Sequence, residues 1–178
     1  MIKTKLYLAG GLFNAGERLH NLYLEKHLRP LGLDVILPQR EALKFFKGGK
    51  FNVRGIVRDC RKDAAAKEHI VVASLDGADA DGGTAVEYAI GVTKTGRAIV
   101  YRTDFRTVED RELGLNAMFL IKGTSFVYFP CYFTELEEVE EYYRKLAQAI
   151  YAAVVLALGK KKEAKTPKKQ KQTGKKRR

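Results

Sequence analysis

Short apolar runs alternate with amphipathic segments along most of the chain. Five runs have the length and composition of strands: KTKLYLA (3–9), DVIL (34–37), HIVVASL (69–75), AIVY (98–101) and SFVYF (125–129). The run at 69–75 is apolar at nearly every position, which is typical of a strand buried on both faces of a sheet. Helical spacing is predicted for residues 15–31, 53–67, 84–95 and 135–158.

This alternation of strands and helices predicts a parallel sheet with helices on both faces. We therefore expect an α/β fold, a three-layer sandwich with a roughly five-stranded parallel sheet of the flavodoxin/Rossmann-like kind. Ligands bind beyond the carboxyl ends of the strands in such sheets. Two of these ends carry the richest loops, the glycine-containing AGGLF (9–13) and the acidic DGADADGG (76–83).

The sequence also predicts features of the first helix and of two loop segments. In the first helix, four leucines are predicted to lie on or near one face: Leu19, Leu22, Leu24 and Leu28. Residues 39–52 are basic, and we expect an irregular loop that is mobile around Gly48 and Gly49. The polar residues 104–117 give no clear signal for a helix or a strand.

The formal net charge of +12 lies almost entirely at one end of the chain. Residues 160–178 contain eleven Lys/Arg and one Glu, whereas residues 1–159 have a net charge of only +2. We therefore expect a folded domain over 1–159 and a disordered basic tail over 160–178. A solvated appendage, a polybasic targeting signal and weak, non-specific contact with polyanions all remain open for the tail, which has no aromatic residue for base stacking.

Cysteine, histidine and hydropathy patterns exclude several classes of protein. Cys60 and Cys131 stand apart in no CxxC spacing, which indicates a reducing compartment rather than a disulfide framework or a zinc site. The chain has three histidines, His20, His27 and His69. Their spacing is not that of metal ligands, so we expect no metal site. The longest apolar run, 147–158, is too short for a bilayer. We expect a soluble cytoplasmic protein without membrane contact.

The loop and helix after the third strand carry the densest group of carboxylates. Asp76, Asp79 and Asp81 follow the strand, and Glu87 lies at the start of the next helix. Thr84 and Glu87 fit a capping box, in which Glu87 would only satisfy a backbone N–H, and spacing alone favours this structural role. The aspartates lack the regular alternation of a calcium loop, so a cation site is disfavoured.

The glycine loop at 9–18 lacks both the GK[ST] ending of a P-loop and the GxGxxG pattern of a dinucleotide site. Phe13 in this loop is either a core residue or a platform for a flat ligand, and taken alone it favours the core. Tyr7, taken alone, is an ordinary strand aromatic.

Three stretches in order, YLAGGLF, VVASLDGADADGGTAVEYAIG and LNAM (115–118), resemble the nucleoside 2-deoxyribosyltransferase family. The resemblance covers essentially residues 5–130. Its most specific part is a DxGTAxExG-like stretch from Asp81 to Gly91, in which the separation of six between Asp81 and Glu87 is kept. Tyr88 and Ala89 stand where members of the family vary.

The resemblance implies that 1–159 is a catalytic domain that needs no cofactor. Its substrates would be a deoxynucleoside and a free nucleobase. Glu87 would be the nucleophile of a double displacement through a covalent deoxyribosyl-enzyme, and Tyr7 would orient it. Asp81 would bind a sugar hydroxyl, and Phe13 would belong to the base pocket.

The family pattern also implies an obligate homo-oligomer, a dimer or a hexamer with shared active sites. Asn116, with Met118 close by, would reach the sugar in a neighbouring subunit's site. The family further places an Asp or Asn before the third strand to exchange a proton with the base. Asp59 and Asp63 both qualify, and we favour Asp63, which is one turn nearer the strand.

Two other functions stay open. The same superfamily contains N-glycosidases that hydrolyse nucleoside 5'-monophosphates, which commonly have a serine where this chain has Asn116. That asparagine favours the transferase, although the basic side chains of 39–50 could meet a phosphate: Arg40, Lys44, Lys47 and Lys50. A non-catalytic module that binds nucleotides or polyanions is the third hypothesis. Acceptance of purines alone or of purines and pyrimidines is left open.

Overall fold

The computed structural model describes residues 4–106 and 115–163. The strands are β1 (Thr4–Ala9), β2 (Leu33–Ile36), β3 (Phe46–Lys47), β4 (Lys50–Phe51), β5 (His69–Ser74), β6 (Ala98–Arg102) and β7 (Thr124–Tyr128). The α-helices are α1 (Ala15–Leu28), α2 (Pro38–Glu41), α3 (Val53–Ala65), α4 (Gly82–Thr95) and α5 (Val139–Glu163). Four short 3₁₀ helices join them: η1 (Arg29–Leu31), η2 (Ala42–Phe45), η3 (Ala117–Phe119) and η4 (Leu136–Glu138).

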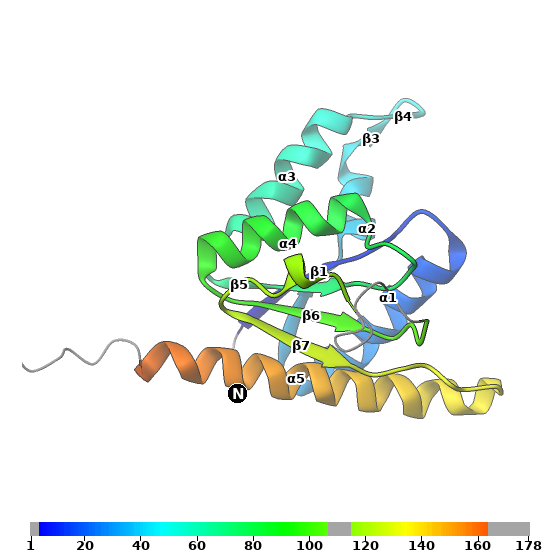
Figure 1. Ribbon diagram of the computed structural model, residues 1–178. Coiled ribbons are helices and arrows are strands. Elements are labelled where there is room, and N and C mark those ends of the chain that lie inside the picture. The colour runs from blue at the N-terminus through cyan, green and yellow to red at the C-terminus, as the bar shows by residue number, and fades with distance from the viewer. Residues whose placement is uncertain (1–3, 107–114, 164–178) are drawn as a thin grey trace, which may run out of the picture.

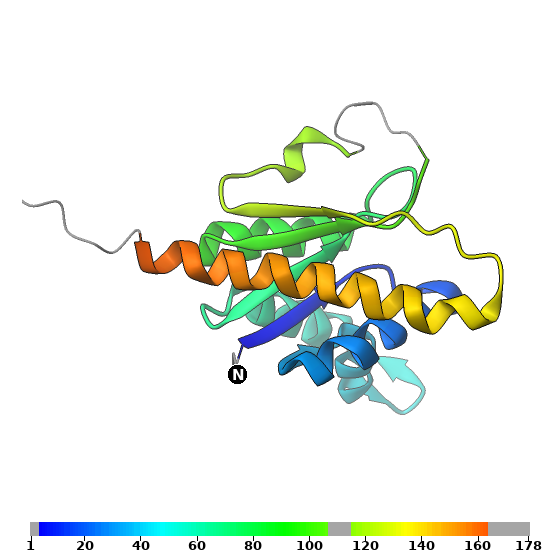
Figure 2. The ribbon, with the colours of Figure 1, turned by 90° about the horizontal axis from the view of Figure 1, so that it is seen from below.

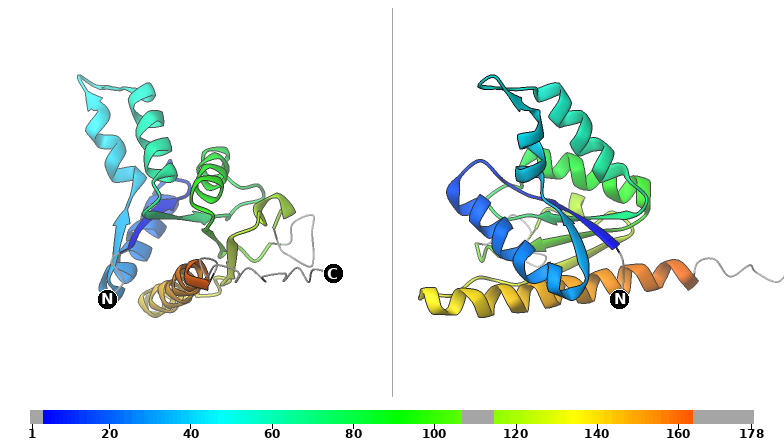
Figure 3. Two further views of the ribbon diagram at one scale, coloured as in Figure 1. Left: turned by 90° about the vertical axis from the view of Figure 1, so that its left-hand side faces the viewer. Right: turned by 180° about the vertical axis from the view of Figure 1, so that it is seen from behind.

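Five strands form one sheet in the order β2-β1-β5-β6-β7, and every neighbouring pair is parallel. Helices α3 and α4 cover one face, and α1 and α5 cover the other (Figures 1 and 3). This arrangement confirms the predicted three-layer α/β sandwich. The direction of the connections reverses between the adjacent strands β1 and β5, which is where such sheets bind ligands.

Alternate residues of the central strands enter two separate cores. Leu6 and Leu8 of β1 join the core that also contains residues of α1 and α5. Tyr7 and Ala9 point to the opposite face and join the core beneath α3 and α4. Because side chains alternate between the two faces along a strand, Tyr7 faces α4, the helix that carries Glu87. Figure 2 shows α5 running across the other face of the sheet.

The segment 39–52 is more regular than expected. It forms α2, η2 and a β3–β4 hairpin in place of an irregular loop, and Phe46 pairs with Phe51. Gly48 and Gly49 have φ angles of 57° and 77°, and both lie in the two-residue turn between the strands. Two successive positive φ values are what a tight hairpin turn requires, and glycine adopts them without strain.

The helices also differ from the expected pattern in two places. Leu24 and Leu28 of α1 are buried, but Leu19 and Leu22 are largely exposed, so the predicted apolar face is only half as wide. Helix α5 continues through Glu163, four residues into the expected tail, because Lys and Glu favour helix in its last turn. Residues 164–178, and 107–114 of the ambiguous segment, lie outside the described residues. None of the described helices has both the length and the hydropathy that a bilayer crossing requires.

Candidate active site

The glycine loop after β1 is held by a capping box at the start of α1. The Glu17 N–H donates to Asn14 Oδ1 at 3.0 Å, and the Glu17 carboxylate accepts from the Phe13 N–H at 2.7 Å. A Cβ atom on Gly11 would lie 2.5 Å from the Glu17 carboxyl carbon, so a larger residue there would displace the Glu17 side chain from this cap. The loop leaves the Phe13 side chain 80% exposed. The prediction of a core role for Phe13 is therefore wrong.

Helix α4 begins two residues earlier than expected, and Asp81 is its N-cap. Asp81 Oδ2 accepts from the Thr84 N–H at 2.8 Å and from the Thr84 hydroxyl at 3.1 Å. The predicted capping box, with Thr84 as the cap and Glu87 as its partner, is therefore wrong. Glu87 lies in the second turn of the helix, where its side chain contacts strand β1.

The partner of Glu87 is Tyr7, which is 80 residues away in the sequence. The Tyr7 hydroxyl donates to Glu87 Oε1 at 2.7 Å, and Tyr7 is only 1% exposed. Gly91, one turn further along α4, explains how the helix comes so close to the sheet. A Cβ atom there would lie 2.3 Å from Val71 Cγ2, and Val71 pairs with Tyr7 between β5 and β1.

Burial raises the pKa of the Glu87 carboxyl above its ordinary value, and the negative charge of Asp81 adds to the rise. Hydrogen bonds from Tyr7 and Cys60 act in the opposite direction. Burial also raises the pKa of the Cys60 thiol, so the thiol is protonated beside Glu87. Sequence reasoning did not identify Cys60 as part of this group, because its place on α3 becomes apparent only once α3 and α4 are packed together.

A cavity of about 410 Å³ lies at the carboxyl ends of β1 and β5, and neither Tyr7 nor Glu87 is among its lining residues. Its lining residues come from the glycine loop, α1 and the acidic loop: Gly11, Gly16, Glu17, His20, Asn21, Ser74, Asp76, Gly77, Asp79 and Asp81. Asp81 belongs to this lining and also caps the helix of Glu87. The volume is in the range of small-molecule sites.

His20 and Asn21 also line this cavity, and sequence reasoning did not identify either as a site residue. His20 lies between two hydroxyl groups, Tyr143 at 2.9 Å from Nδ1 and Tyr101 at 2.9 Å from Nε2. Burial lowers the pKa of His20, so its imidazole is held neutral. Asn21 donates to the carbonyl oxygen of Gly11 and so supports the glycine loop. Both tyrosine partners of His20 are more than 80 positions away, and no local pattern marks such a contact.

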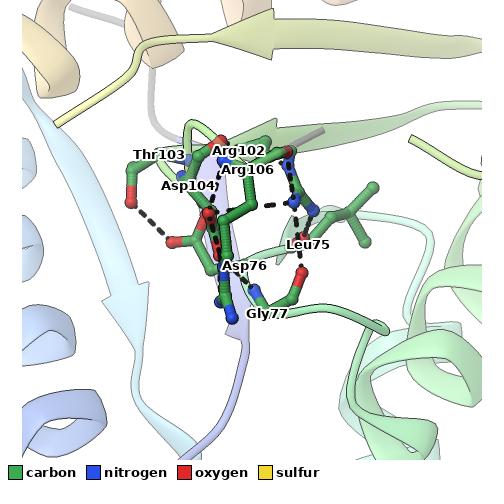
Figure 4. A network of polar contacts seen from close by, with 7 residues as sticks. All are labelled: Leu75, Asp76, Gly77, Arg102, Thr103, Asp104 and Arg106. Atoms are coloured by element: carbon green, nitrogen blue, oxygen red, sulfur yellow. Dashed lines mark hydrogen bonds and ion pairs between the residues drawn. The ribbon is translucent and has the colours of Figure 1, made fainter. Parts of the chain in front are cut away.

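The first aspartate of the acidic loop has a structural role (Figure 4). Asp76 accepts from the Thr103 N–H and hydroxyl, each at 2.6 Å, and from the Asp104 N–H at 2.9 Å. The buried Arg102 guanidinium donates to the carbonyl oxygens of Leu75 and Gly77 at 2.6 and 3.1 Å. These bonds tie the loop after β5 to the end of β6, which fixes the position from which Asp81 starts α4.

The two candidate proton donors lie in different surroundings. Asp63 lines a second cavity of about 560 Å³ with Lys5 and His69, which begin β1 and β5 at the opposite end of the sheet. Burial raises the pKa of its carboxyl, and Asp59 adds to the rise. Asp59 lies one turn earlier on α3, beside Cys60 and nearer the carboxyl ends of the strands. The structure does not bring Asp63 to the pair of Tyr7 and Glu87.

Asn116 and Met118 lie on the surface of the chain. Asn116 Oδ1 accepts from the Met118 N–H at 2.9 Å and caps η3, and the Met118 side chain is 76% exposed. Neither residue lines the cavity beside Asp81. Within the described residues, no group of three or more His, Cys, Asp or Glu side chains could hold a metal ion.

Comparison with known proteins places the chain in a family. The model of the nucleoside 2-deoxyribosyltransferase family matches residues 6–118, which is more than half of the chain. The chain belongs to this family. The matched stretch contains Tyr7, Asp81 and Glu87, so the predicted resemblance is confirmed and the protein falls among transferases that act on nucleosides.

Two solved structures share the fold. A conserved protein from Enterococcus faecalis is 25% identical, with a TM-score of 0.55, and the match covers 81% of this chain and 99% of that one. A 2-deoxyribosyltransferase from Bacillus psychrosaccharolyticus is 23% identical, with a TM-score of 0.53, covering 76% and 90%. At this identity the second likeness concerns the fold alone. No curated protein sequence matches the chain.

Proposed function

We propose that the protein transfers 2-deoxyribose between nucleobases through a covalent intermediate on Glu87. The observation that carries the proposal is the hydrogen bond from the buried Tyr7 to Glu87 Oε1. Glu87 lies on α4, whose N-cap Asp81 lines a cavity of about 410 Å³. This bond holds one carboxylate oxygen in a fixed position, as a nucleophile requires. Membership of the nucleoside 2-deoxyribosyltransferase family supplies the substrate class.

The reaction consists of two displacements at the anomeric carbon of the sugar. A Glu87 oxygen forms a bond to the anomeric carbon while the bond between that carbon and the base nitrogen breaks. The electron pair of the broken bond and a proton go to the departing base. A nitrogen of the second base then attacks that carbon and gives its proton back to the acidic side chain that supplied the first one, while the bond to Glu87 breaks and the carboxylate is restored. Two inversions retain the original configuration. Free Glu87 must be ionised for the first step, so its raised pKa sets the acid limit of activity.

The remaining roles follow from where the side chains lie. The second oxygen of Asp81, Oδ1, has no partner within the described residues and is proposed to accept from a sugar hydroxyl. The exposed ring of Phe13 is proposed to cover the base at the mouth of the cavity. Asn116 and Met118 are proposed to act in a neighbouring protomer's site, which makes the enzyme a dimer or a hexamer.

For the proton that reaches the base, we propose Asp59 in place of Asp63. Asp59 is adjacent to Cys60, whose thiol contacts both Tyr7 and Glu87. Asp63 faces the amino end of the sheet beside His69. A cytoplasmic location is proposed as well, because Cys60 and Cys131 are both free thiols.

The second candidate is hydrolysis of a nucleoside 5'-monophosphate. Its support was the basic segment 39–50, but two of those side chains have anionic partners. Arg40 donates to both oxygens of the buried Glu25 at 2.7 Å, and Lys44 pairs with Glu41. Fewer free cationic groups therefore remain in 39–50 than the sequence implies, and none of the four lines the cavity beside Asp81, which favours a substrate with a free 5'-hydroxyl.

A base-exchange assay tests the two functions together. Purified protein is incubated with deoxyinosine and adenine, and in parallel with deoxyadenylate and no acceptor base, and the products are separated by chromatography. We expect deoxyadenosine in the first reaction and no release of adenine in the second. Adenine released only from the monophosphate would replace the transferase with the hydrolase, and no product in either reaction would contradict both.

A further inference from the structure

The β3–β4 hairpin projects from the body of the protein beyond the amino end of α3 (Figures 1 and 3). It carries two aromatic rings on its surface, Phe46 at 47% and Phe51 at 48% exposure, with ring centroids 4.7 Å apart. The two rings contact each other across the hairpin, and about half of each side chain stays exposed to solvent. A surface of this kind is available for a ligand with flat rings.

A hollow of about 450 Å³ opens beside the rings. Its lining combines cationic and aromatic side chains with one amide: Lys44, Phe45, Lys47, Lys50, Phe51 and Asn52. Phe45 is fixed against α3, since a Cβ atom on Gly55 would lie 2.6 Å from its ring. Apart from Lys44, which pairs with Glu41, the lysines of this hollow have no salt-bridge partner in the part of the chain that the structure describes.

Positive charge continues from the hollow along α3. Arg54, Arg58 and Arg61 follow one another at spacings of four and three, which places them on one exposed face of the helix. None of the three has a salt-bridge partner among the described residues. Residues 38–62 carry eight Lys/Arg and two carboxylates, a net charge of +6, whereas the rest of 1–159 has a net charge of −4. The cationic character of the domain is therefore concentrated on this surface.

These features match the chemistry of a nucleic acid strand. Unpaired bases stack on exposed aromatic side chains, and a row of cations follows the phosphates. The rings lie at one end of the basic row, so a bound strand would place bases on the hairpin and backbone along α3. A single nucleotide would occupy the hollow but leave the arginine row without a ligand. A duplex is disfavoured because its bases are not free to stack.

We propose that the β3–β4 hairpin and the arginine face of α3 bind single-stranded nucleic acid. Phe46 and Phe51 stack with bases, while Lys47, Lys50 and the three arginines contact phosphates. The hollow shares no lining residue with the cavity beside Asp81, and the proposal does not depend on the transferase activity.

The charge contribution is tested by fluorescence anisotropy with labelled oligo-deoxythymidine and oligo-uridine of about twelve nucleotides. The full-length chain is compared with the double variant Lys47→Glu/Lys50→Glu and with Lys94→Glu/Lys122→Glu, which makes the same change in charge at exposed sites elsewhere. We expect the hairpin variant to bind at least about tenfold more weakly and its salt slope to fall by about 1.4, since each phosphate contact contributes about 0.7. The control variant should stay within about twofold of the parent protein.

The aromatic contribution is tested with a second matched pair of variants. Phe46→Leu/Phe51→Leu removes the hairpin rings, and Phe105→Leu/Tyr132→Leu removes another exposed ring pair, with centroids 5.4 Å apart. We expect about a tenfold loss for the hairpin variant with an unchanged salt slope, and no loss for the control. Far-UV circular dichroism checks that each variant folds.

Three results would overturn the proposal. Equal losses in the hairpin and control variants would assign binding to net charge or to the basic residues 160–178. Competition by adenylate or inorganic tripolyphosphate at the same concentration as the strand would show that only phosphate is recognised. If the hairpin variants dissociate an oligomer in sedimentation velocity and bind the strand normally, the surface is an interface between copies of this chain.

Discussion

At the scale of single residues, opposing influences act on the Glu87 carboxyl. Burial and the charge of Asp81 raise its pKa, and the hydrogen bonds from Tyr7 and Cys60 hold that rise in check. A raised pKa makes the carboxylate more basic and so a better nucleophile, but it also requires a higher pH for ionisation. Tyr7 therefore both orients the carboxylate and favours its ionised form.

Replacing Tyr7 by Phe should move the acid limb of activity to higher pH. The variant loses a hydrogen bond that lowers the Glu87 pKa, so that pKa rises further, and ionised Glu87 is lost at a higher pH than in the parent protein. We also expect kcat/KM at neutral pH to fall about tenfold or more, the value of one hydrogen bond to a charged group. The pH profile of kcat/KM in the base-exchange assay measures both. An unmoved acid limb would contradict the role given to Tyr7.

The two candidate proton donors are distinguished by a pair of matching variants. Asp59→Asn should lower base exchange by about 10² to 10⁴, because a proton donor to the departing base is lost. Asp63→Asn should leave the rate within about threefold, because Asp63 faces the other end of the sheet. Single-turnover rates with deoxyinosine and adenine provide the comparison. The reverse ranking would restore Asp63 as the proton donor.

The sequence predicts part of this site and not the rest. Tyr7, Asp81 and Glu87 stand in ordered motifs, so resemblance to a family identifies them. Local spacing alone gave the wrong partner for Glu87, because a capping-box pattern does not reveal that the helix starts at Gly82. Cys60 and His20 escaped prediction because their contacts depend on how distant elements pack together.

At the scale of elements, the closeness of α4 to β5 decides where Glu87 lies. Gly91 is the contact point, with no room for a Cβ atom beside Val71. Glycine in a helix interior lowers helix propensity by about 1 kcal/mol relative to alanine, so its presence here follows from packing.

Gly91→Ala should destabilise the protein by about 1–3 kcal/mol, because overpacking against Val71 outweighs the gain in helix propensity. Gly159→Ala is the matched control, since no atom lies within 4 Å of its Cβ position on α5. That variant should be neutral or up to about 1 kcal/mol more stable. Urea unfolding gives the free energy of unfolding of each. Equal effects of the two substitutions would contradict the close packing of α4.

The hairpin illustrates what sequence patterns leave out at this scale. Strands of two residues are too short for a periodic signal, so the basic composition of 39–52 was interpreted as an irregular loop. One signal was present, because Gly48-Gly49 between Phe46-Lys47 and Lys50-Phe51 fits a two-residue hairpin turn. The longer elements of the sheet were predicted to within about two residues because their apolar runs are continuous.

At the scale of the whole molecule, the layered fold was predictable from alternating strands and helices, whereas the expected homo-oligomer rests on the family resemblance alone. Asn116 and Met118 are exposed and lie outside the cavity of their own chain. Our proposal that they complete a neighbouring protomer's site makes the active site a property of the oligomer.

Subunit complementation tests this shared site. Glu87→Gln and Asn116→Ala should each be nearly inactive alone, because each leaves every site incomplete. After the subunits are mixed and allowed to exchange, some sites combine an intact Glu87 with an intact Asn116. We expect activity to return to as much as about a quarter of the parent value in a random mixture of dimers. Persistent inactivity in a mixture shown by native mass spectrometry to contain hybrids would contradict the shared site.

The most direct test of the account is the rate of base exchange in the variant Glu87→Gln. Glu68→Gln, an exposed glutamate at the amino end of β5, makes the same chemical change away from the site. We predict that Glu87→Gln lowers the rate of deoxyadenosine formation from deoxyinosine and adenine by several orders of magnitude, because the nucleophile is lost, while Glu68→Gln stays at the parent rate. A Glu87→Gln variant that retains the parent rate to within about tenfold would contradict covalent catalysis at Glu87.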